Sequence, residues 1–139
     1  MIFRYQQYIK ENSDQTLIKL KEICLDSIQE IIDLKLHDKE NFKLGARDYS
    51  EFWEKENGYY DIDVKLDKDF YSNIITIKTE IRIANHTKIL SPYIVTKLGG
   101  LLYRLDRIGF ISKMPIVTWN SITYAVIIES YIKLADIKI

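Results

Sequence analysis

Two neighbouring segments of this chain alternate apolar and polar residues with a period of two. In the first segment the apolar positions are Tyr60, Ile62, Val64 and Leu66, and in the second the inward positions are Ile75, Ile77, Thr79, Ile81 and Ile83. Successive side chains of a β-strand point to opposite faces of a sheet, so each segment predicts a strand with one buried and one solvated face. Because the stretch between them, residues 67–73, is short and polar, we expect an antiparallel hairpin.

Helical spacing marks the segment that precedes this hairpin. From Ser13 to about Leu36, apolar residues recur every three or four positions, and Ser13 or Asp14 is of the type that caps the first turn of a helix. Residues 37–47 have the pattern of a connector, and residues 48–56 that of a short helix. Asn57-Gly58 is the clearest turn signal in the sequence.

A second long helix is predicted from Ser91 to Ile108. Ser91-Pro92 is typical of a helix start, and Gly109 is typical of the left-handed residue that ends a helix. Gly99-Gly100 falls inside this segment, where each Gly costs about 1 kcal/mol relative to Ala. The pair therefore predicts either close approach by another backbone or a break into two shorter helices.

The last third of the chain fits either strand or helix, and its β-branched residues favour strand. We expect a strand over residues 115–119, a turn at Asn120-Ser121 and a long strand over residues 122–133. The predicted order is helix, strand, strand, helix, strand, strand. This order indicates a single α+β domain over residues 1–139, with an antiparallel sheet of about four strands and both helices packed on one face.

Composition favours a globular cytoplasmic protein. The 139 residues are enough for one domain, and 47% of them are hydrophobic while 29% are charged. The one cysteine, Cys24, has aliphatic neighbours, which predicts an inert buried thiol in a reducing compartment. The two histidines, His37 and His86, are expected in solvated loops. A signal-peptide pattern and an apolar run of the ~20 residues that span a membrane are both missing, so we expect no membrane association.

Acid and base are separated along the chain, although their totals of 20 each cancel. Residues 11–70 contain 16 Asp and Glu but nine Lys and Arg, whereas residues 71–139 contain four and nine. This asymmetry predicts a dipolar molecule that meets charged partners in a preferred orientation.

One pattern in the predicted hairpin suggests catalysis. The spacing of Asp61, Asp63 and Glu80 resembles the active site of the PD-(D/E)xK nuclease superfamily, which implies a divalent metal held by acids and a lysine that assists the attacking water. Arg82 stands at the position of that lysine, and a guanidinium does not take up a proton. The interpretation that we favour is a ladder of opposite charges across the hairpin. We therefore expect no catalytic residue, bound metal or cofactor.

A basic segment supports a second hypothesis, nucleic-acid binding. Between Arg82 and Lys113 the chain has six Lys and Arg and a single acid, Asp106. If Gly99-Gly100 is a turn, the two short helices and the later strands suggest a winged helix. Its nucleic-acid contacts are then predicted at Lys97, Tyr103, Arg104 and Arg107.

The hypothesis that we favour rests on a cluster of aromatic and acidic residues between positions 48 and 61. Its predicted interface residues are Phe52, Trp53, Tyr59, Tyr60, Glu51, Glu54 and Glu56. Trp and Tyr dominate binding hot spots because they bury much area with few torsions to freeze, and acids steer a basic partner. We expect a non-enzymatic inhibitor or adaptor that binds a basic protein surface, of the kind that neutralises a toxin or antagonises a nuclease. The alternative is that Phe52 and Trp53 close one end of the sheet.

Overall fold

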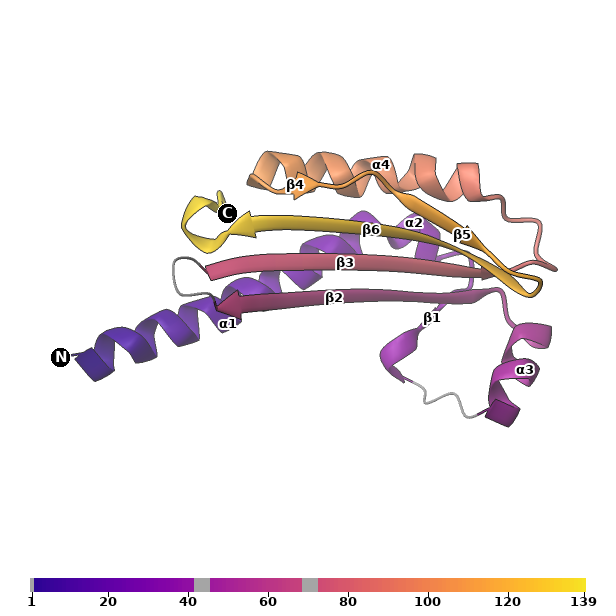
Figure 1. The fold of residues 1–139 in the computed structure, drawn as a ribbon, viewed down its shortest axis with the longest axis horizontal. Coiled ribbons are helices and arrows are strands. Elements are labelled where there is room, and N and C mark those ends of the chain that lie inside the picture. The colour runs from indigo at the N-terminus through magenta and orange to yellow at the C-terminus, as the bar shows by residue number, and fades with distance from the viewer. Residues whose placement is uncertain (1, 42–45, 69–72) are drawn as a thin grey trace.

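The computed structural model describes residues 2–41, 46–68 and 73–139. Within these residues the chain forms four α-helices, six β-strands and two short 3₁₀ helices, arranged in one α+β architecture (Figure 1). In chain order they are α1 (Ile2–Ser27), α2 (Gln29–Ile32), β1 (His37–Asp38), η1 (Lys39–Asn41), α3 (Ala46–Lys55), β2 (Gly58–Lys68), β3 (Asn73–Ala84), α4 (Ser91–Ile108), β4 (Ile111–Ser112), β5 (Ile116–Trp119), β6 (Thr123–Lys133) and η2 (Leu134–Asp136).

The six strands form one mixed sheet in the order β1-β2-β3-β6-β4, and β5 also pairs with β6. The predicted β2–β3 hairpin is confirmed, since Tyr60 pairs with Ile81 and Ile62 with Thr79 in antiparallel register. The predicted order of helix, strand, strand, helix, strand, strand was wrong in detail, because α2 and α3 are two further helices. The sheet also has more than the expected four antiparallel strands, since β1 joins β2 in parallel and β4 adds a further edge segment. Each of these additions has only two residues, which is too short to leave a period in the sequence.

One face of the sheet is apolar and covered by the two long helices. On β3 this face carries Ile75, Ile77, Ile81 and Ile83, all at most 1% exposed. These side chains form one cluster with buried residues of α1, α2, α4 and β6. Figure 1 shows α1 and α4 running along the length of the strands. Both long helices therefore pack on the same face, as predicted.

The other face of the sheet, called the open face below, carries the polar positions of the same strands. Tyr59 is opposite Arg82 on this face, Asp61 is opposite Glu80, and Asp63 is opposite Lys78. Figure 1 shows α3 set apart from the long helices, at one end of the strands. The open face is thus the surface on which charged groups gather.

The helical part of the N-terminal half differs from the prediction. α1 begins at Ile2, so Ser13 lies inside the helix, where it is buried, and neither Ser13 nor Asp14 is a cap. A capping residue type marks where a helix can begin, and packing overrides this signal when the side chain is buried. The helical segment also stops before Leu36, because α1 is followed by the single turn α2 and then by Lys35 with a φ of 65°.

The second long helix, α4, is continuous across Gly99 and Gly100. Both glycines are exposed, and a Cβ added at either would meet no atom within 4 Å. Neither predicted explanation for the pair therefore holds. The two short helices that a winged helix requires are one helix. Ser91, expected as the capping residue, is the first residue of α4, since Leu90 is the N-cap. Gly109 ends α4 with a φ of 117°, as predicted.

The turn at Asn57-Gly58 connects α3 to the sheet. Gly58 has a φ of 153°, and a Cβ at this position would lie 2.0 Å from the carbonyl oxygen of Arg82, so only glycine fits. The side-chain amide of Asn57 donates to the backbone carbonyl of Leu34 at 2.9 Å, and the backbone carbonyl of Asn57 accepts from the N–H of Ala84 at 2.8 Å. These bonds hold the end of α3 against the sheet.

Two further predictions concern the C-terminal strands and the cysteine. The ambiguous segment over residues 122–133 is a strand, β6, and β5 precedes it. Cys24 is fully buried, and burial raises the pKa of its thiol to about 12, so it stays protonated at neutral pH.

None of the helices in the described part of the chain has both the length and the apolar character that a membrane crossing requires.

Candidate functional site

Trp53 and Phe52 of α3 pack against the open face instead of pointing into solvent. Trp53 is 3% exposed and Tyr59 6%, and they form a cluster with Ala84 and the half-buried Phe52. The ring centroids of Trp53 lie 4.9 Å from Phe52 and 5.6 Å from Tyr59. Trp53 and Tyr59, expected as exposed anchors, are therefore buried, because the apolar side of α3 needs a surface to cover. The alternative prediction, that this cluster closes one end of the sheet, fits the structure.

The remaining predicted interface residues are divided between different surfaces. Tyr60 lies on the helix-covered face, packed against the main core. Glu51 and Glu54 are exposed on α3, and Glu51 pairs with Lys55 at 3.1 Å. Glu56 pairs with His37 at 2.8 Å. His37 was predicted in a solvated loop, but it lies in the strand β1. The acids of the predicted interface stay at the surface while its aromatic rings do not.

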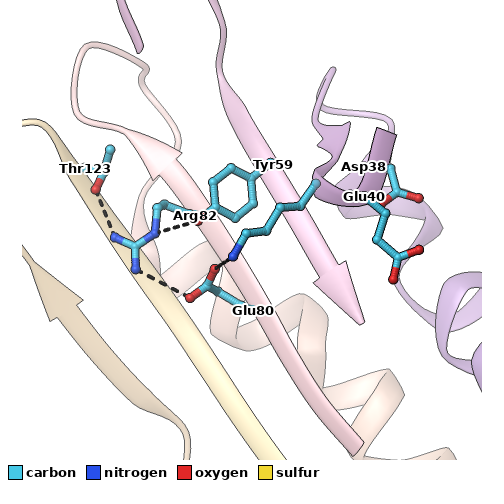
Figure 2. A network of polar contacts seen from close by, with 7 residues as sticks. Asp38, Glu40, Tyr59, Glu80, Arg82 and Thr123 are labelled. Carbon is cyan, nitrogen blue, oxygen red and sulfur yellow. Dashed lines mark hydrogen bonds and ion pairs between the residues drawn. The ribbon is translucent and has the colours of Figure 1, made fainter. Parts of the chain in front are cut away.

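Arg82 organises a polar network on the open face beside the aromatic cluster (Figure 2). Its guanidinium donates to the Tyr59 hydroxyl at 3.1 Å and to the Thr123 hydroxyl at 3.1 Å, and it lies 3.5 Å from a Glu80 oxygen. Burial, and then the nearby Glu80 carboxylate, raises the pKa of Tyr59, so its phenol remains protonated. Because the planar guanidinium bonds three groups at once, it fixes the orientation of both Tyr59 and Glu80.

A cation of the chain itself lies over this network. The ammonium of Lys39, from η1, is 5.2 Å from the centroid of the Tyr59 ring and 3.8 Å from Oε2 of Glu80. The Glu80 side chain is only 14% exposed, and among the described residues its Oε2 atom has no hydrogen-bond partner. Figure 2 shows the Glu80 carboxylate beside the Arg82 guanidinium. An aromatic face and a carboxylate together form a seat for a positive charge.

Nothing in the residue pattern indicated this arrangement. Lys39 falls in the predicted connector over residues 37–47, where nothing in the pattern separates it from other lysines. Lys39 reaches Tyr59 because β1 pairs with β2 in parallel, which brings together residues that are about 20 positions apart in the sequence. Arg82 and Glu80 were recognised only as members of a possible nuclease motif or a charge ladder.

The acids of the predicted nuclease motif are engaged in other contacts. Asp61 lies directly opposite Glu80, as the motif requires, but Asp63 pairs with Lys65 at 3.1 Å and Glu80 is held by Arg82. Across residues 2–41, 46–68 and 73–139, no three His, Cys, Asp or Glu side chains gather in a group that could hold a metal. Burial has the largest effect on the pKa of Asp61 and raises it. The positive charge of Lys39 has the next largest effect and lowers this pKa, and the negative charge of Glu80 then raises it.

The predicted nucleic-acid residues lie on α4, and acids of the neighbouring helical segments engage two of them. Lys97 pairs with Glu30 at 2.7 Å, and Arg104 pairs with Asp26 at 2.7 Å. Arg107 donates to the hydroxyl of Tyr103 at 2.9 Å. Charge from the acidic and the basic parts of the sequence thus meets across the helical layer.

Comparison with known proteins adds no information about this surface. No family model matches the chain, and no curated protein or solved structure is significantly similar to it. What the surface can bind follows from its own residues. These are exposed carboxylates on α3, a fixed aromatic face and a partly satisfied carboxylate on β3.

Proposed function

We propose that this chain is a non-enzymatic protein-binding module, an inhibitor or adaptor, that engages a basic partner through its acidic end. The acidic end consists of Glu51, Glu54 and Glu56 at α3 together with Asp61 and Glu80 on the adjoining open face. The observation that carries the proposal is that Trp53 and Tyr59 fasten α3 to the sheet, which leaves Glu51 and Glu54 exposed on a fixed support. In this proposal the buried Trp53 ring supports the surface and is not one of its contacts.

The distribution of ion pairs supports this choice of surface. Asp26 and Glu30 belong to the acidic half of the sequence, but Arg104 and Lys97 of α4 neutralise them. At the acidic end Glu51 and Glu56 are also paired, with Lys55 and His37, but Glu54 is exposed and no ion pair is found for it among the described residues. Charge that is not neutralised internally steers association and selects partners of opposite charge.

The test is capture of partners from the native host by the full chain and by a charge-reversed variant. We expect that Glu51→Lys combined with Glu54→Lys slows association with a captured basic protein at least about tenfold, because the steering field is reversed. Binding by the wild type should also weaken as salt is added. Association rates measured with the purified pair at two ionic strengths give both results.

A matched control changes net charge by the same amount elsewhere. Asp14 and Glu22 are exposed on α1, so Asp14→Lys combined with Glu22→Lys alters the total charge without touching the acidic end. We expect this variant to retain most of the association rate. If both double variants retain the same partners at the same rates, the acidic end is not the binding surface.

A further inference from the structure

We propose that Glu80, Asp61 and the Tyr59 ring form a seat for one cationic side chain of the partner, an arginine or a lysine, and that Lys39 occupies this seat until the partner displaces it. The inference rests on the proposed function, because it names the point on the acidic end where a basic surface inserts. We call this group of three residues the cation seat.

The cation seat is incompletely satisfied by Lys39. The Lys39 ammonium lies 3.8 Å from Oε2 of Glu80, which is beyond the 2.7–2.9 Å of a charge-assisted hydrogen bond. That oxygen is buried and has no hydrogen-bond partner among the described residues. A buried carboxylate oxygen without a donor is costly, so a cation that approaches more closely gains a bond that Lys39 does not make.

The walls of the seat are rigid. The Tyr59 ring packs beside the buried Trp53, at 5.6 Å between centroids, and the Tyr59 hydroxyl accepts a hydrogen bond from Arg82. Arg82 lies 3.5 Å from the other oxygen of Glu80, which fixes the carboxylate beside the ring (Figure 2). A preorganised site loses little conformational freedom when a ligand side chain enters.

Lys39 is suited to leave the seat. It belongs to the three-residue helix η1, outside the long strands, and its side chain is 48% exposed. Figure 2 shows Asp38 and Glu40 on the same short segment, apart from Glu80. The pair with Glu80 is long, at 3.8 Å, and its lysine is half exposed, so we take displacement to cost as much as breaking a weak ion pair, a factor of about five in affinity at most.

The second acid makes the seat selective for positive charge. Asp61 lies directly opposite Glu80 on the neighbouring strand. Arg82 is held by its hydrogen bonds to Tyr59 and Thr123, so Lys39 is the cation near both carboxylates that a partner can replace. A neutral side chain leaves Asp61 without the positive charge that Lys39 supplies, and leaves Glu80 with Arg82 alone. A guanidinium has the further advantage of two parallel donors and a flat face that stacks on a tyrosine ring.

The experiment uses blocked arginine, N-acetyl-arginine amide, as the probe and the full chain as the receptor. Nuclear magnetic resonance follows the Tyr59 ring and the Trp53 indole during titration. In the variant Lys39→Met the seat is vacated, and we expect binding about fivefold tighter than in the wild type. The variant Lys39→Met with Glu80→Gln should lose this gain, and N-acetyl-citrulline amide, which is neutral, should not bind either protein.

Lys55→Met is the matched control, because Lys55 is an exposed lysine paired with Glu51 outside the seat. It should leave the affinity for the probe unchanged. Equal affinities for Lys39→Met and Lys55→Met, or resonance changes far from Tyr59, overturn the inference. Since Lys39→Met alone removes only a partly exposed side chain, the result stands even if Glu80→Gln weakens the fold.

The outcomes separate the seat from the proposed function. If charge reversal on α3 abolishes partner association while Lys39→Met has no effect on the probe, the acidic end binds without the seat. If the probe behaves as expected and charge reversal changes nothing, the seat exists but the proposed protein-binding role fails.

Discussion

On strand β3 the side chains that face the long helices are aliphatic and buried, whereas Lys78, Glu80 and Arg82 on the other face are charged. The covered face depends on close packing, in which many aliphatic groups contribute and each can be replaced by a similar one. The open face depends on a few polar groups whose partners are specific, such as Arg82 with Tyr59 and Thr123. The comparison teaches that the covered face stabilises the fold through many interchangeable apolar contacts, whereas the open face does so through a few specific polar ones.

The largest effect is expected from a cavity in the covered face. Ile81 is fully buried, so Ile81→Ala should lower the free energy of unfolding by about 2–5 kcal/mol. Its counterpart on the open face, Lys78→Ala, should change that energy by no more than about 0.5 kcal/mol, because Lys78 is exposed. Urea unfolding of both variants measures the difference. Similar losses of unfolding free energy in Ile81→Ala and Lys78→Ala would mean that the two faces of β3 contribute equally to stability.

Trp53 tests whether the aromatic cluster supports the open face or contacts a partner. Because Trp53 is almost completely buried, Trp53→Ala should lower the free energy of unfolding by about 3 kcal/mol. Tyr49 is 38% exposed, and its ring centroid lies 5.7 Å from that of Trp53. Tyr49→Ala should lower the free energy of unfolding by only about 1 kcal/mol. Unchanged stability together with lost partner binding in Trp53→Ala would restore Trp53 as an exposed anchor.

Arg82 tests how specific the polar contacts of the open face are. Arg82→Met leaves Tyr59 and Glu80 without their shared donor and should destabilise the fold by about 2 kcal/mol. Arg82→Lys should recover only part of this loss, since one ammonium does not span the acceptors that the guanidinium bridges. Thermal unfolding of the two variants decides the point. A lysine variant as stable as the wild type would show that charge alone is sufficient.

The outer surface of α4 is expected to be free of packing. Gly99→Ala should therefore raise the free energy of unfolding by about 1 kcal/mol, because a methyl group meets open space and improves helix propensity. Gly58→Ala is the contrasting variant, and it should lose more than about 1 kcal/mol because its Cβ collides with the Arg82 carbonyl. Chemical denaturation measures both. A destabilised Gly99→Ala would reveal a contact on this surface.

The smallest effect concerns the charge of Asp61. Burial raises its pKa against the opposing effect of Lys39, and Glu80, Asp63 and Glu40 raise it further. The folded state therefore disfavours the charged form, so this group reduces stability as pH rises through its raised pKa. Asp61→Asn should be more stable at pH 7 by less than about 1 kcal/mol. The advantage should disappear below the ordinary value of 3.8, and an advantage that grows on acidification would contradict this sign.

Local patterns were reliable where one residue period dominates a long segment. The hairpin β2–β3 and the helix end at Gly109 followed from spacing and turn residues alone. For β6 the spacing fitted strand or helix, and the β-branched residues favoured the strand that is found. The same reasoning failed at Ser13, a capping type inside a helix, and at Gly99-Gly100, which neither breaks α4 nor touches another backbone. In both places a local signal was outweighed by the surrounding helix.

The candidate site was only partly predictable, because its residues meet through tertiary contacts. The acids of α3 were identified, but whether the nearby rings lie inside or outside depends on which side of α3 faces the sheet. Lys39 had no distinguishing feature, since its role follows from the parallel pairing of β1 with β2.

By itself the sequence determined the α+β class, the two faces of the hairpin and the burial of Cys24, because each depends on periodicity or on apolar neighbours in the chain. Only the tertiary structure decided that Trp53 and Tyr59 are buried, that α4 is unbroken and that Lys39 lies over Tyr59 beside Glu80. The physical reason is that hydrophobic periodicity is a property of neighbouring residues, whereas burial and charge pairing depend on which distant surfaces come into contact.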